Sequence, residues 1–116
     1  MLHKMKLNEG PFTAMKSGKK TIEVRLNDLK RQGLSVGDRI EFRKLPELKE
    51  KLEVHVISLE TFNTFEAMYL AIPTQHFGDE GGSLSEMVEA TYEIYSPRQE
   101  EKWGTLAIGV KLIKER

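Results

Sequence analysis

The sequence predicts an α+β domain: a mostly antiparallel sheet or small β-barrel of about five to six strands, with about three peripheral helices. Two observations lead to this prediction. Strand-like alternation of apolar and polar residues dominates the first half of the chain, and no long helices interrupt it, which argues against a doubly wound fold. Two helix-like stretches and one more alternating stretch follow. The 116 residues fit a single domain, 1–116, with a core of its own.

Residues 2–7 alternate and predict a first strand. A short helix is expected next, with Pro11 at its first position, where the missing N–H is not needed. Phe12 and Met15 stand three residues apart on this helix and face the core. Gly18 suits the left-handed conformation that follows a helix end.

Three further strands are predicted at residues 21–26, 39–43 and 52–56, with a polar hairpin loop before the last of them. A second helix is expected over residues 62–72, capped by Asn63 or Thr64.

A capping box, Ser83-Leu84-Ser85-Glu86, opens a third helix. Its mostly apolar residues share one face: Leu84, Met87, Val88, Thr91, Ile94 and Tyr95. Pro97 ends that helix, residues 98–102 form a charged linker, and the last strand follows over 106–112.

The composition excludes several classes of function. The chain has no cysteine, so disulfides and thiolate metal sites are excluded. Its three histidines are far apart in sequence, so no metal site is expected. No apolar run reaches the roughly 20 residues of a membrane span and no secretory segment is recognisable, so a cytoplasmic protein is expected.

Charge is unevenly distributed along this neutral chain. Residues 1–44 hold 11 Lys and Arg against 5 Asp and Glu, a balance of +6, and residues 45–116 hold 7 against 13, a balance of −6. A basic face of this kind attracts phosphate, although an ordinary solvated surface gives the same pattern.

The stretch from Gly18 to Arg25 holds most of the candidate chemistry. Side chains alternate along a strand, so Ile22, Val24 and Leu26 share an apolar face. Glu23 and Arg25 share the opposite, free face. The candidate ligand-binding residues are Lys19, Lys20, Glu23, Arg25 and Asp28.

Two interpretations of this charged face remain open on spacing alone. In one, Arg25 holds a phosphate or carboxylate, Lys20 acts as base or anion ligand, and Glu23 accepts from the amino edge of a base or positions water. In the other, the face is a cross-strand ladder of ion pairs, with Glu23 against Arg39 or Arg43 and Arg25 against Glu41.

The same stretch resembles the ASCH domain family, of the small bacterial single-domain type, within the PUA-like superfold. The family pattern GxKxxExR is met by Gly18, Lys20, Glu23 and Arg25. The segment from Val36 to Phe42 and the closing strand from Gly104 also resemble the family, so the likeness covers nearly the whole chain. The resemblance implies a PUA-like β-barrel with a cleft lined by the motif residues and a role with RNA or a nucleotide.

The resemblance also implies possible catalysis. One branch of the family consists of N-acetylcytidine amidohydrolases, with a catalytic Lys, Thr and Glu. Lys20 matches the Lys and Glu80 loosely matches the Glu, but Glu23 stands at the Thr position, and a carboxylate substitutes poorly for a hydroxyl. Other members are ribonucleases, and a metal-independent reaction of that kind needs only Lys and Arg beside a carboxylate.

The favoured hypothesis is an RNA- or nucleotide-binding module that uses no cofactor. The first alternative is a hydrolase with Lys20, Glu23 and Glu80 as catalytic residues, acting on a modified nucleoside or on RNA. The second is a regulatory protein that binds no nucleic acid. Monomer and weak dimer both remain open.

Overall fold

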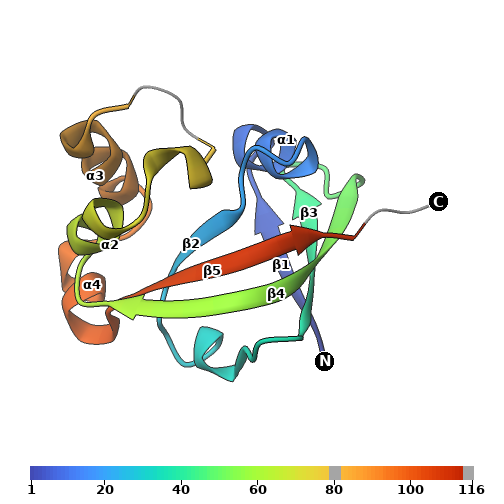
Figure 1. Ribbon diagram of the computed structural model, residues 1–116, viewed down its shortest axis with the longest axis horizontal. Coiled ribbons are helices and arrows are strands. Elements are labelled where there is room, and N and C mark those ends of the chain that lie inside the picture. Colours follow the sequence, from blue (N-terminus) through green and yellow to red (C-terminus); the bar gives the residue numbers. More distant parts are fainter. Residues whose placement is uncertain (79–81, 114–116) are drawn as a thin grey trace.

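The computed structural model describes residues 1–78 and 82–113, which form an α+β fold (Figure 1). Five strands make one sheet in the order β1-β3-β4-β5-β2. The pairing of β1 with β3 is parallel and the other three pairings are antiparallel. The strands are β1 (Leu2–Leu7), β2 (Ile22–Leu26), β3 (Arg39–Lys44), β4 (Lys51–Phe62) and β5 (Thr105–Leu112). The α+β class and the small barrel-like sheet are therefore confirmed.

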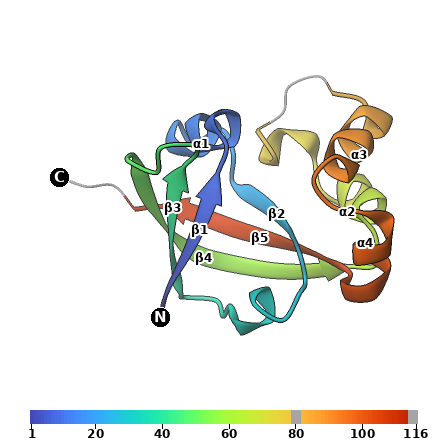
Figure 2. The same ribbon diagram turned by 180° about the vertical axis from the view of Figure 1, so that it is seen from behind.

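The sheet curls into a half-barrel whose two edge strands are β1 and β2 (Figure 2). The main core fills its concave side, where the fully buried Ile40, Phe42 and Val54 meet Ile108. Helix α1 (Glu9–Lys16) adds Phe12 and Met15 to this core, as predicted.

A second, smaller core lies on the other face of β2 and β5. Helices α2 (Phe65–Ala71) and α3 (Leu84–Tyr92) pack against each other there and contribute Met68 and Met87. Ile22 and Val24 of β2 pack against this cluster. The apolar face of β2 thus covers the smaller core, so its charged face turns toward the concave side of the half-barrel.

The boundaries of two predicted helices need correction. Helix α1 begins at Glu9, so Pro11 occupies its third position rather than its first. Helix α2 begins at Phe65 rather than at residue 62, because β4 continues to Phe62 before Thr64 caps the helix through the amide of Ala67. The prediction of Thr64 as one of two candidate caps is confirmed.

The predicted linker at residues 98–102 is wrong, because a fourth helix, α4 (Pro97–Trp103), occupies it. Pro97 does not close the preceding helix but stands at the start of this one, and Ser96 and Gln99 form its capping box. The inclusion of Ile94 and Tyr95 in the third helix is also wrong, since α3 ends at Tyr92, and Ile94 is 69% exposed. Two 3-10 turns, η1 (Arg31–Gly33) and η2 (Thr74–His76), complete the elements of the described residues.

Candidate ligand-binding cavity

A cavity of about 690 Å³ opens over β2, between the half-barrel and the helices α2 and α3. One wall comes from the end of β1 and from α1, and the other from the residues that follow η2 and from α2 and α3. Its volume falls within the range of cavities that hold small molecules. Polar and apolar side chains divide the lining, which comprises Lys6, Leu7, Asn8, Gly10, Pro11, Ala14, Lys20, Glu23, Val24, Arg25, Leu45, Tyr69, Phe77, Gly78, Met87, Ala90, Thr91, Ile94 and Tyr95.

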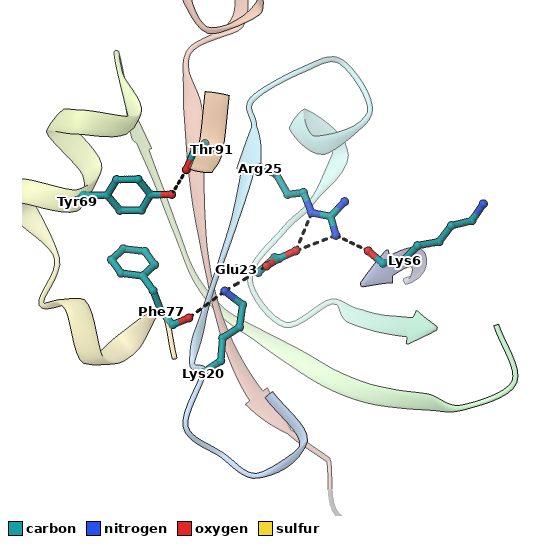
Figure 3. A network of polar contacts seen from close by, with 7 residues as sticks. All are labelled: Lys6, Lys20, Glu23, Arg25, Tyr69, Phe77 and Thr91. Carbon is teal, nitrogen blue, oxygen red and sulfur yellow. Dashed lines mark hydrogen bonds and ion pairs between the residues drawn. The ribbon is translucent and has the colours of Figure 1, made fainter. Parts of the chain in front are cut away.

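Lys20 is brought to this cavity by the turn that ends α1. Gly18 adopts a φ of 84°, which an L side chain rarely tolerates, and the chain then enters β2. The backbone of Lys20 bridges to Phe77, and its side chain is buried. Its ammonium donates to the Phe77 carbonyl at 3.4 Å and lies 3.4 Å from Oε1 of Glu23 (Figure 3).

Glu23 is the central charge of the cavity. Its residue exposure is only 6%, although it is a carboxylate on an edge strand. Nε of Arg25 donates to its Oε2 at 2.8 Å, and Lys20 approaches the other oxygen. A buried carboxylate needs such partners, because removing an ion from water is costly unless opposite charges and hydrogen bonds replace the water. The expectation that this face is free is therefore wrong for Glu23.

Arg25 spans the open seam of the half-barrel. Its Nη2 donates to the backbone carbonyl of Lys6 on β1 at 2.8 Å (Figure 3). Its side chain is only 13% exposed. The same guanidinium therefore anchors Glu23 and ties the two edge strands together.

Aromatic side chains form the opposite wall. Tyr69 and Phe77 meet edge to face, with ring centroids 5.1 Å apart. Thr91 donates to the Met87 carbonyl, so its hydroxyl accepts from the Tyr69 hydroxyl at 2.7 Å. These residues were not among the predicted site residues, because aromatic and methyl groups at helical spacing indicate a core as readily as a binding surface.

Tyr95 joins this wall from the turn after α3. Its ring stacks on Phe65 with centroids 5.7 Å apart. Burial raises the pKa of the Tyr95 hydroxyl above its usual value, and the nearby charges of Arg25 and Glu23 act on this pKa in opposite directions. Tyr95 is therefore a neutral hydroxyl in the lining of the cavity at ordinary pH.

Three predicted residues lie elsewhere or cannot be placed. Lys19 is exposed and does not line the cavity. Asp28 does not line it either, and instead accepts from the Arg31 amide at 3.1 Å. Glu80 lies outside the described residues. The structure thus brings together Lys20, Glu23 and Arg25 from the predicted set.

The ion-pair partners predicted for the cross-strand ladder are wrong. Glu23 pairs with Lys20 and Arg25 of its own segment, whereas Glu41 pairs with Arg43 at 3.0 Å and with Lys51 at 3.7 Å. The physical reason is the curl of the sheet. It places Glu23 on the concave side and leaves the charges of β3 on the convex side, where the pKa of Glu41 is lowered mainly by the hydrogen bond from Arg43.

Within residues 1–78 and 82–113, no three His, Asp or Glu side chains come close enough together to hold a metal ion. None of the helices described is long and apolar enough to cross a membrane.

Comparisons with known proteins agree with this fold. A model of the ASCH domain family matches residues 5–114. The crystal structure of the hypothetical protein PH0355 is 31% identical, with a TM-score of 0.87 over 97% of this chain and 100% of that one. The solution structure of protein PF0455 from Pyrococcus furiosus is 29% identical, with a TM-score of 0.79 over 99% and 100%.

An ASCH domain from Lactobacillus crispatus shares the fold at 14% identity, with a TM-score of 0.68 over 95% of this chain and 79% of that one. No curated protein matches the chain.

Proposed function

The chain belongs to the ASCH domain family, and from this membership we propose that it binds RNA or a nucleotide in the cavity over β2. Members of this family are thought to bind RNA. The convergence of Lys20, Glu23 and Arg25 in one cavity is the observation that supports the proposal most.

Each side chain has a role that its contacts allow. The Lys20 ammonium has three donors and meets two acceptors at the long distance of 3.4 Å, so it can turn toward a phosphate. Arg25 commits Nε and Nη2 to Glu23 and Lys6, which leaves Nη1 to face a ligand. Glu23 accepts from the amino edge of a base.

The aromatic wall supports a ligand with a flat ring. Tyr69, Phe77 and Tyr95 offer the apolar surface on which a base stacks, and base stacking on aromatic side chains stabilises single-stranded complexes by about 1–3 kcal/mol per base. A cavity of about 690 Å³ suits one or a few nucleotides rather than a long strand.

Binding of a short RNA and of mononucleotides by the purified protein at several salt concentrations tests the proposal. We expect affinity to fall as salt rises, and Lys20→Met to weaken binding about tenfold or more, because a charge-assisted contact to phosphate is lost. Lys16→Met is the matched control: it removes the same charge from an exposed position on α1, where the ammonium lies 3.8 Å from Glu50. Salt-independent binding, or equal losses in both variants, would contradict the proposal.

A hydrolase is the second candidate, because the buried Lys20–Glu23 pair offers a base and a carboxylate at one point of the cavity. The hydroxyl of an N-acetylcytidine amidohydrolase has no evident counterpart. Thr21 contacts His76 at 3.2 Å and does not line the cavity, and the Thr91 hydroxyl is engaged by Tyr69. A metal-independent ribonuclease needs no such hydroxyl. Incubation with N-acetylcytidine and with short RNAs should give turnover that Lys20→Met abolishes, and no turnover across this panel would leave the binding function alone.

A further inference from the structure

A second cavity lies at the other end of β2, beside α4. Its volume is about 690 Å³, and it shares no lining residue with the first cavity, the one over β2 described above. It is bounded by the end of β4, by the connection from β4 to α2, by α4 and by Asn27, the residue that follows β2. Figure 1 shows α4 at the end of the sheet that lies away from α1. The function proposed above makes no use of this second cavity.

Three polar side chains in its lining are uncommitted. The side-chain amides of Asn27 and Asn63 and the hydroxyl of Thr61 make no hydrogen bond within residues 1–78 and 82–113. Asn27 is nevertheless held in place, because its backbone amide donates to the Gly104 carbonyl and its backbone carbonyl accepts from Gln32. A carboxamide presents a donor beside an acceptor, which matches the polar edge of a nucleobase. The two amides are therefore suited to pair with a base.

Trp103 adds an aromatic surface to the second cavity. It is the only tryptophan of the chain and is half-buried at the end of α4, so a ligand can reach its indole. The Lys102 ammonium lies 4.9 Å from the centroid of this ring, a position that cation–π attraction favours. Nucleobases stack on aromatic side chains with little regard to sequence. An indole and two amides thus line the same cavity.

The charges of the lining disfavour an ionic ligand. Lys102 already places a positive charge over the Trp103 ring, which repels a second cation. The carboxylates of Glu100 and Glu101 line the cavity against this one ammonium, so a phosphate is disfavoured as well. An uncharged flat ring with polar edges, as in a nucleobase, is the ligand that these side chains fit.

The two cavities are neighbours at two points of the chain. Arg25 lines the first cavity and Asn27 lines the second. The pairing of β2 with β5 continues to the Asn27 amide, so the Cα atoms of these two residues are about 7 Å apart. Tyr95 lines the first cavity and Pro97 the second, again two residues apart. A strand of a few nucleotides that places one nucleotide in the first cavity is therefore long enough to reach the second.

We propose that Asn27, Asn63 and Trp103 form a second binding site, which takes an uncharged nucleobase. The inference rests on the proposed function and extends its ligand: the cations of the first cavity hold a phosphate, and the amides and indole of the second cavity hold a base. Two sources share this chemistry, the next base of the RNA strand bound in the first cavity and a separate nucleoside.

Tryptophan fluorescence tests this site in the unaltered protein, because Trp103 is the only tryptophan. The probes are a nucleoside and a five-nucleotide RNA. We expect saturable quenching of the emission, since a base stacks on the indole. Quenching by both probes at similar concentrations identifies a separate nucleoside. Quenching by the RNA alone identifies the next base of the strand, and Lys20→Met should then raise the RNA concentration needed by about tenfold or more.

Substitutions in the second cavity provide the independent test. Asn27→Ala and Asn63→Ala should each lower the affinity for the quenching probe by about three- to tenfold, because a hydrogen bond to the base is lost. The salt slope of RNA binding should not change, since neither substitution removes a charge. Trp103→Leu should lower RNA affinity about tenfold, measured by calorimetry because the fluorophore is gone.

Gln75→Ala is the matched control, because it removes an exposed side-chain amide that lines neither cavity. The Asn27 and Asn63 side chains make no hydrogen bond within the described residues, so their variants test the site even if Trp103→Leu unfolds.

The two proposals fail in different ways. Unchanged emission at saturating RNA, with RNA affinity kept in Asn27→Ala and Asn63→Ala but lost in Lys20→Met, would overturn the second site alone. Absence of binding to both probes by the unaltered protein would overturn both proposals.

Discussion

Replacing Arg25 with alanine should destabilise the fold by about 4 kcal/mol. Removing one partner of a buried ion pair costs about 3–5 kcal/mol. This range applies to Arg25 because its partner Glu23 is buried. Lys20 stays 3.4 Å from Glu23 and offsets part of this cost, which favours the lower end. The lost bond to the Lys6 carbonyl across the seam adds about 1 kcal/mol.

Urea and thermal denaturation measure this change, which corresponds to a drop in Tm on the order of 10 °C. Arg39→Ala, an exposed arginine paired with Glu53 at 3.4 Å, is the control and should cost less than about 1 kcal/mol. The triple variant Arg25→Ala, Glu23→Gln and Lys20→Met should recover part of the loss, because no charge of the buried cluster is then left uncompensated. A loss for Arg25→Ala as small as that of the control would refute the structural role assigned to Arg25.

Three further predictions concern the scaffold. The hydrogen bond with His3 is the main cause that holds the pKa of Asp38 below its usual value. Ionised Asp38 therefore stabilises the fold when the pH is above the usual pKa. This stabilisation is lost as the pH falls through the lowered pKa. Asp38→Asn should accordingly flatten the acid side of a curve of unfolding free energy against pH. Gly109→Ala should cost about 1–3 kcal/mol, because a Cβ there overlaps the Ser58 hydroxyl on β4, and adding Ser58→Gly should restore most of the loss in urea denaturation. Glu100→Gln should cost about 1–3 kcal/mol in the same assay, because the buried carboxylate accepts from the first amide of α2 at 2.7 Å.

Short sequence patterns correctly predicted those strands and helix ends that are determined by neighbouring residues in the chain. Alternation placed the strands of the first half, the left-handed Gly18 ended α1, and the box of Ser83 and Glu86 opened α3. The family pattern predicted that Lys20, Glu23 and Arg25 belong together, and the structure places all three in one cavity.

Features that depend on the curl of the sheet were beyond prediction from the sequence. A strand with one apolar and one charged face ordinarily turns the charged face to solvent. In this fold β2 has a core on each side, so Glu23 is buried together with its partner Arg25. Phe77 follows η2 and Tyr95 follows α3, so both residues reach the cavity over β2 only through the tertiary fold.

Mapping the bound ligand on the protein tests the central claim most directly. In a titration of the labelled protein with a five-nucleotide RNA, followed by amide NMR shifts, we expect the largest shifts at Lys20, Glu23 and Thr91, which line the cavity. Shifts confined to the convex face of the sheet, at Lys4 and Arg39 for example, would contradict binding in the cavity over β2.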